Sequence, residues 1–159
     1  MTRPRGFVAR VLGPAAVMPR RSIIYRKERC MASIIVLDDV SDAGVLVKRI
    51  LERQGHQVTA FTEEEEAIRH AAKGATDLAI LDIKLKRMTG VEVLAEMKKF
   101  APRIKVIMLT GYPTLETARE SLKLGASEYC VKPIDKEELE SKVADVLGKD
   151  DANRQDEAP

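Results

Sequence analysis

The chain has 159 residues, a length that fits one domain with its own hydrophobic core. Trp is absent and aromatic residues make up only 4% of the chain, so aliphatic side chains must form that core. The formal net charge of +2 is unevenly spread: residues 1–30 hold eight Arg or Lys and one Glu, whereas residues 31–159 hold 19 basic and 24 acidic residues. This acidic main part argues against general nucleic-acid binding, and we expect no direct contact with DNA.

Cysteine content and hydropathy indicate where in the cell the protein is located. Cys30 and Cys130 are too few for a disulfide framework or a zinc site, so we expect two free thiols in a reducing cytoplasm. No apolar run approaches the roughly 18 residues that a membrane span needs. The sequence therefore predicts a cytoplasmic protein that does not enter the membrane.

Residues 1–30 are basic, contain three prolines and show no periodic apolar pattern. Arg20-Arg21 resembles the start of a twin-arginine export signal, but polar residues follow where that signal needs an apolar segment, so we expect no export. Three interpretations stay open: a disordered extension, a start of synthesis at Met31, or a basic arm that touches an anionic surface. The absence of a foldable pattern favours the first two.

From residue 33 onward, short apolar runs alternate with amphipathic segments. The runs are too continuous for half-exposed strands and are typical of buried parallel strands. We predict strands over residues 33–37, 57–61, 77–81, 104–109 and 127–131. Apolar residues at helical spacing predict helices over residues 41–54, 63–73, 90–100, 114–124 and 135–147. The polar, acidic segment 149–159 is expected to be a disordered tail, which leaves 31–148 as the domain.

Capping and stop signals support these boundaries. The expected helix caps are Ser41 or Asp42, Thr114 and Asp135. The expected stops are Gly55, Gly74 and Gly125. Strict alternation of strands and helices predicts an α/β fold, with a doubly wound five-stranded parallel sheet and five helices. In the strand order 2-1-3-4-5, the switch point where ligands bind lies between strands 1 and 3.

Polar residues directly follow four of the five predicted strands: Asp38-Asp39, Asp82, Thr110 and Lys132. Each alone has an ordinary explanation, as a turn, a helix cap or a solvated lysine. Together they would lie at one carboxyl edge of the sheet, with Asp38 and Asp39 across the crevice from Asp82. Their joint occurrence therefore predicts a site at that edge.

The residue types indicate the chemistry of this site. Three converging carboxylates repel one another unless a cation lies among them, and Mg²⁺ accepts such oxygen ligands together with a phosphate oxygen. One carboxylate could then attack phosphorus and form an acyl phosphate. The Lys132 ammonium would balance the phosphate charge, and the Thr110 hydroxyl would donate a hydrogen bond to it.

Four motifs at matching spacing carry a family resemblance: VLDD at 36–39, LAILDIKL with MTG within 78–90, MLTGY at 108–112 and EYCVKPI at 128–134. On these motifs, residues 33–147 resemble the receiver domain of bacterial two-component response regulators, with the CheY-like (flavodoxin-like) fold. The resemblance implies that a histidine kinase supplies a phosphoryl group and that Mg²⁺ is the cofactor.

The resemblance also implies roles for individual residues at the site. Asp82 matches the phosphoacceptor. Asp39 and Asp82 match direct Mg²⁺ ligands together with the backbone carbonyl of Lys84, whereas Asp38 acts mostly through water. Thr110 matches the switch hydroxyl.

Five further positions belong to the same pattern. Lys132 matches the phosphate-binding lysine, and its bond to Pro133 would be cis. Tyr129 matches the aromatic residue whose rotamer reports the switch. Gly111 would stay small so that the backbone can approach the phosphate, and Gly90 would open the third helix.

The chain departs from the family pattern at three places. Met88-Thr89-Gly90 stands where many receivers have Pro before Gly, and Val40 follows the acidic pair where an acid is common. Lys84 and Tyr112 flank the expected path of the hydrolytic water. We predict that Tyr112 shields the acyl phosphate; the alternative is that its ring merely packs on its own loop.

These expectations lead to several hypotheses of function. The first is a single-domain receiver without an output domain, which signals to an unknown protein through the fourth helix, fifth strand and fifth helix. Dimerisation on phosphorylation stays open. Alternatives are a phosphorelay intermediate that passes the group to a histidine phosphotransfer domain, and a pseudo-receiver that carries no phosphate. An enzyme of the haloacid-dehalogenase type fits less well, because its nucleophile lies on the first strand in a D-x-D motif.

Overall fold

Residues 31–155, the part of the chain that this computed structural model describes, contain five strands and five helices in strict alternation. The strands are β1 (Ser33–Leu37), β2 (Gln57–Phe61), β3 (Leu78–Leu81), β4 (Lys105–Thr110) and β5 (Glu128–Val131). All neighbouring strands are parallel, and the sheet has the order β2-β1-β3-β4-β5. The predicted fold class and strand order are confirmed.

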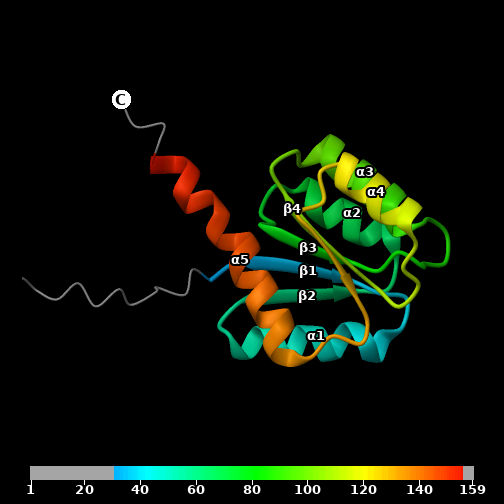
Figure 1. The fold of residues 1–159 in the computed structure, drawn as a ribbon, viewed down its shortest axis with the longest axis horizontal. Coiled ribbons are helices and arrows are strands. Elements are labelled where there is room, and N and C mark those ends of the chain that lie inside the picture. Colours follow the sequence, from blue (N-terminus) through cyan, green and yellow to red (C-terminus); the bar gives the residue numbers. More distant parts are fainter. Residues whose placement is uncertain (1–30, 156–159) are drawn as a thin grey trace, which may run out of the picture.

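The helices cover both faces of this sheet (Figure 1). They are α1 (Ser41–Arg53), α2 (Glu64–Ala72), α3 (Gly90–Phe100), α4 (Leu115–Lys123) and α5 (Lys136–Gln155). Alternate strand residues face opposite sides, so that Ile35 and Leu37 join the core cluster beneath α2 and α3, whereas Ile34 and Val36 join the cluster beneath α1 and α5. Near-continuous apolar runs are therefore required, because both sheet faces are buried.

Most helix ends follow the sequence signals, and the exceptions are the cap of α1 and the end of α5. The Thr114 hydroxyl accepts a hydrogen bond from Thr117 N, and Asp135 Oδ1 accepts one from Glu138 N, so both predicted caps are confirmed. The stops are also confirmed, because Gly55, Gly74 and Gly125 follow their helices with φ of +92°, +80° and +92°. The cap predicted at Ser41 or Asp42 is wrong. Val40 occupies that position, and no side chain caps α1.

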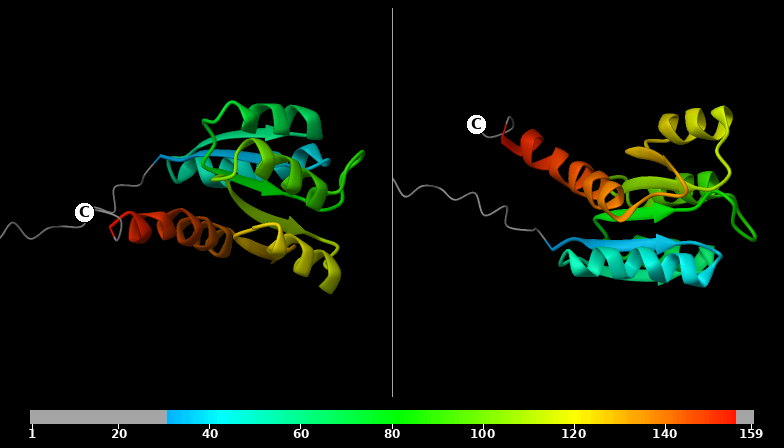
Figure 2. Two further views of the ribbon diagram at one scale, coloured as in Figure 1. Left: turned by 90° about the horizontal axis from the view of Figure 1, so that it is seen from above. Right: turned by 60° about the horizontal axis from the view of Figure 1, so that its bottom comes forward.

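Helix α5 is longer than the sequence pattern predicts. It continues to Gln155 instead of ending near residue 147, and Figure 2 shows its last turns extending beyond the sheet. Gly148 follows the predicted end of the helix, but glycine inside a helix costs only about 1 kcal/mol relative to alanine, so it does not end α5. No proline interrupts the polar segment that follows, so residues 149–155 belong to the helix and not to a disordered tail.

Other expectations concern residues 1–30 and 156–159, which lie outside the described part of the chain. The proposed disorder, the alternative start at Met31 and the state of Cys30 fall there. Within the described part, Cys130 is a buried free thiol, and burial raises the pKa of that thiol. No helix between residues 31 and 155 is long and apolar enough to cross a membrane.

Candidate functional site

Strand register brings the predicted polar residues to one edge of the sheet. Leu37, Leu81 and Met108 lie side by side in adjacent strands, and Asp38 and Asp82 each follow one of them directly. The Asp82 amide donates to the Leu37 carbonyl at 3.0 Å, which extends the pairing of β1 and β3 to the acidic residues. The crevice between β1 and β3 is therefore the switch point expected from the strand order.

Three carboxylates meet in this crevice. Asp38, Asp39 and Asp82 each offer an oxygen within 4.8 Å of the others. Asp38 and Asp82 are buried, with residue exposures of 5% and 9%. Oxygen atoms at this spacing, two of them sheltered from solvent, fit a hard divalent cation such as Mg²⁺.

Lys132 enters the same crevice from the end of β5. Its Nζ lies 2.6 Å from Asp38 Oδ2 and 3.1 Å from Asp82 Oδ2. Burial lowers the pKa of Lys132, but the hydrogen bonds and charges of the two aspartates outweigh that effect and raise the pKa above its usual value. The ammonium is therefore positively charged at neutral pH and placed beside Asp82.

These observations decide the family. The sequence pattern of the response regulator receiver domain matches residues 34–144. The chain belongs to the response regulator receiver domain family.

Individual relatives agree with this assignment. A CheY-like receiver domain protein from Methanospirillum hungatei has a TM-score of 0.75 and 32% identity, and the match covers 77% of this chain and 98% of that one. Sporulation initiation phosphotransferase F from Bacillus subtilis is 32% identical over 114 residues, which cover 72% of this chain and 92% of that protein.

Longer relatives match only in part. Transcriptional regulatory protein ZraR from Klebsiella oxytoca is 33% identical over 114 residues, or 72% of this chain. That match covers 26% of ZraR, so the chain spans about a quarter of the length of this relative.

Two loops of this receiver flank the acidic crevice. Lys84 N donates to Asp82 Oδ1 at 3.3 Å, and Tyr112 N donates to the hydroxyl of the fully buried Thr110 at 3.1 Å. The two loops meet where Lys84 Nζ lies 4.3 Å from the centre of the Tyr112 ring. Tyr112 therefore contacts the neighbouring loop, and not only its own as one interpretation of the sequence held.

Backbone geometry at the site depends on Gly90 and Pro133. A Cβ on Gly90 would overlap the backbone of Asp82 and Ile83, so only glycine allows α3 to begin this close to the acidic residue. The Lys132–Pro133 bond is cis, as the family resemblance implied. Gly111 differs, because a Cβ there would meet no atom within 4 Å.

The Tyr129 hydroxyl contacts α4 in this structure. Its hydroxyl lies 2.9 Å from the hydroxyl of Thr117, on α4. The Thr117 hydroxyl is also 2.9 Å from that of Thr114, the residue that caps the same helix. Thr117 thus connects the tyrosine to the start of α4, a link that the sequence analysis missed although the T-x-x-T spacing signals the cap.

Glu64 is a second residue that sequence reasoning missed. It is the first residue of α2 and only 1% exposed, and its Oε1 accepts hydrogen bonds from the amides of Arg87 and Met88 at 2.8 and 3.4 Å. A signal was present, because Glu64 precedes Ala67 by three residues and Ala71 by seven, which places it on the buried face of the helix. The surrounding run of glutamates hid that position.

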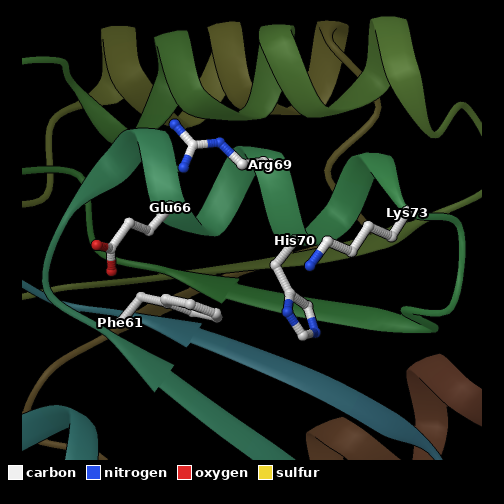
Figure 3. A pocket seen from close by; sticks show the side chains of 5 residues that line it. All are labelled: Phe61, Glu66, Arg69, His70 and Lys73. Atoms are coloured by element: carbon white, nitrogen blue, oxygen red, sulfur yellow. The ribbon is translucent and has the colours of Figure 1, made fainter.

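A separate hollow lies between α2 and the end of β2 (Figure 3). Figure 3 shows His70 beside the Phe61 ring, and the two ring centres are 5.3 Å apart. Glu66, Arg69 and Lys73 complete its lining. None of the residues that line it belongs to the acidic crevice, so the hollow takes no part in the chemistry of that site.

Proposed function

We propose that Asp82 accepts a phosphoryl group from the phosphohistidine of a histidine kinase, with Mg²⁺ as cofactor, and that the resulting acyl phosphate controls binding to another protein. The observation that carries this proposal is the position of the Lys132 ammonium, 3.1 Å from Asp82 within a cluster of three carboxylates. A cation of fixed position beside a nucleophilic carboxylate is what transfer of an anionic group requires.

Asp82 is the nucleophile in this proposal. One of its carboxylate oxygens bonds to phosphorus as the bond from phosphorus to the donor histidine nitrogen breaks, and that nitrogen keeps the electron pair. Lys132, already hydrogen-bonded to Asp82, stabilises the added negative charge. Mg²⁺, held by Asp39, Asp82 and the Lys84 carbonyl with Asp38 in support, supplies further charge neutralisation when bound.

In this proposal the chain catalyses only its own phosphorylation and dephosphorylation and does not turn over a separate substrate. It accepts the group in the cytoplasm, holds it for a time and loses it to water. The buried Thr110 lies at the end of β4, the strand beside β3, and we expect its hydroxyl to move toward the phosphoryl group on Asp82. Such a movement would release its hydrogen bond with Tyr112 N and shift the start of α4.

The face formed by α4 and β5 is the expected binding surface. Leu115, Leu122 and Val131 are 68%, 56% and 49% exposed there. Large apolar side chains that remain exposed on neighbouring elements favour a protein partner. The partner is a downstream protein, or a second copy of the chain when it is phosphorylated.

A second candidate function is a phosphorelay intermediate. It rests on the name of the B. subtilis relative, a sporulation initiation phosphotransferase, and on the high coverage of that protein. A relay intermediate would pass its phosphoryl group to a histidine on another domain instead of losing it to water. The lifetime of the acyl phosphate, measured with and without a histidine phosphotransfer domain, separates the two functions.

The central test is labelling of the chain by acetyl phosphate and by a phosphorylated histidine kinase. We expect labelling that depends on Mg²⁺ and is abolished in Asp82→Asn, because an amide oxygen cannot replace the carboxylate nucleophile. The matched control is Asp145→Asn, which changes an exposed aspartate on α5 and should leave labelling intact. Labelling that persists in Asp82→Asn would overturn the assignment, and steady hydrolysis of phosphomonoesters would favour a phosphatase instead.

A further inference from the structure

Three carboxylates of the described residues are buried: Asp38, Asp82 and Glu64. The first two belong to the crevice, whereas Glu64 lies on α2 and binds the loop between β3 and α3. Burying a carboxylate costs several kcal/mol unless hydrogen bonds replace its hydration. Glu64 Oε1 receives such bonds from two backbone amides, but Oε2 is buried with no hydrogen-bond partner. A glutamate that is only half satisfied is a poor choice for stability alone.

The charge state of Glu64 follows from the same contacts. Burial raises the pKa of its carboxyl, but backbone hydrogen bonds, that of Arg87 foremost, outweigh burial and hold the pKa below its usual value. Glu64 is therefore ionised at neutral pH. Hydrogen bonds from amides to a carboxylate are about twice as strong as those between neutral groups, so this contact restrains the loop firmly.

The restrained loop carries two parts of the acidic site. Lys84, near its start, donates its amide to Asp82 and is expected to offer its carbonyl to Mg²⁺. Gly90, where the loop enters α3, lies against the backbone of Asp82. Glu64 holds the loop midway between these points, through Arg87 and Met88.

The neighbours of Glu64 contact the same loop in a weaker way. Glu63 pairs with Lys86 at 3.8 Å, and Glu65 pairs with Arg87 at 3.7 Å. The side chains of both pairs are 40% to 69% exposed, and ion pairs of this kind contribute about 0–1 kcal/mol. Glu64 is thus the one buried anchor within a row of three contacts.

From this geometry we infer that Glu64 is a positioning residue, which holds the β3–α3 loop in place so that the Lys84 carbonyl is already set for the metal. The inference rests on the proposed function, because it assumes that the crevice binds Mg²⁺. A ligand set that is fixed before the metal arrives loses less entropy on binding, and supporting contacts outside the ligand set typically contribute 10-fold to 100-fold in metal affinity.

The test compares the Mg²⁺ dependence of Glu64→Ala, Glu64→Gln and Glu65→Ala. We expect the half-saturating Mg²⁺ concentration for labelling by acetyl phosphate to rise about 10-fold in Glu64→Ala, with the rate at saturating Mg²⁺ retained. Glu64→Gln keeps an oxygen for the two amides and should shift the concentration by less. Glu65→Ala, which loses only the exposed pair with Arg87, should match the parent chain.

Two measurements separate positioning from a merely structural role. Direct titration of the parent chain and of Glu64→Ala with Mg²⁺, in the absence of any phosphodonor, should show the same loss of affinity. In metal-free protein, the amides of Arg87 and Met88 should exchange hydrogen faster in Glu64→Ala. A purely structural role would lower the fraction of protein that is labelled without moving its half-saturating Mg²⁺ concentration, and that result would overturn the inference.

Failure of this inference is distinguishable from failure of the proposed function. If the parent chain binds Mg²⁺ and is labelled on Asp82 but Glu64→Ala has the same Mg²⁺ dependence, only the role of Glu64 is wrong. If the parent chain is not labelled at all, the proposed function and this inference both fall. If Glu64→Ala does not fold, Glu64→Gln decides: a higher half-saturating concentration supports the role, and an unchanged one overturns it.

Discussion

The two loops beside the acidic crevice are held in very different ways. The β3–α3 loop is anchored by the buried Glu64 and leads into α3, which buries five of its residues. The β4–α4 loop consists of exposed residues from 111 to 114 and leads into α4, whose only buried residue is Ser121. Few buried contacts mean a low free energy of local opening.

This difference assigns a task to each side of the crevice. Under the proposed function, the anchored side carries Asp82 and Lys84, groups that would have to be in place before a phosphoryl group arrives. The lightly packed side carries Thr110 and begins α4, so it can change its conformation at little cost. The contact between Lys84 and Tyr112 crosses from one side to the other.

Substitutions of two glycines, one beside each loop, test the comparison of the two loops, and they have the largest expected effect. In Gly90→Ala the new methyl group would overlap the backbone of Asp82, and we expect a loss of about 1–3 kcal/mol in the free energy of unfolding. In Gly111→Ala the methyl group meets open space, so the change should stay within about 0.5 kcal/mol. Urea unfolding of both variants without Mg²⁺, followed by circular dichroism, measures the difference. Equal losses would contradict the contrast between the two loops.

Tyr112 tests the contact between the loops. If its ring, held over Lys84, restricts access of water to the acyl phosphate, Tyr112→Ala should lose its phosphoryl group about two- to fivefold faster. This corresponds to the roughly 0.5–1 kcal/mol expected of a solvent-exposed cation–π contact. The measurement is the first-order decay of labelled protein after acetyl phosphate is removed.

The matched control keeps the ring. Tyr112→Phe removes only the hydroxyl and should decay at the rate of the parent chain. An unchanged rate in Tyr112→Ala would show that the ring does not shield the phosphate, whatever its contact with Lys84.

The sequence predicted the strands and the residues of the acidic crevice better than it predicted the contacts that hold the adjoining loops in place. Buried parallel strands are signalled by apolar runs, and Asp38, Asp82 and Lys132 were found because each directly follows such a run. Glu64 was not found, because its role depends on a hydrogen bond to a loop 23 residues away in the chain. Such a contact leaves no local pattern beyond an acidic residue on an apolar helix face.

Helix ends show a second limit of the sequence. The cap of α1 and the end of α5 were predicted wrongly, since Ser41 and Asp42 are typical capping residues and the segment after Leu147 is polar. A single cap, or a glycine such as Gly148 inside a helix, changes the stability of the helix by only about 1 kcal/mol, which the rest of the helix outweighs. The Thr117–Tyr129 contact was missed for a different reason. No local signal predicts it, because it depends on how α4 packs on β5.

That contact provides the last test of the lightly packed side, with the smallest expected effect. Thr117→Val and Tyr129→Phe each remove one of the two hydroxyl groups, and a double-mutant cycle isolates their shared hydrogen bond from the capping role of Thr117. We expect a coupling energy of about 0.5 kcal/mol in unphosphorylated protein, at the low end for a neutral hydrogen bond because Tyr129 is only partly buried. If phosphorylation draws Tyr129 inward, the coupling should vanish when the same cycle is measured by thermal unfolding in excess acetyl phosphate and Mg²⁺. A coupling of equal size in both states would show that Tyr129 stays on Thr117, and that α4 responds to Asp82 by another route.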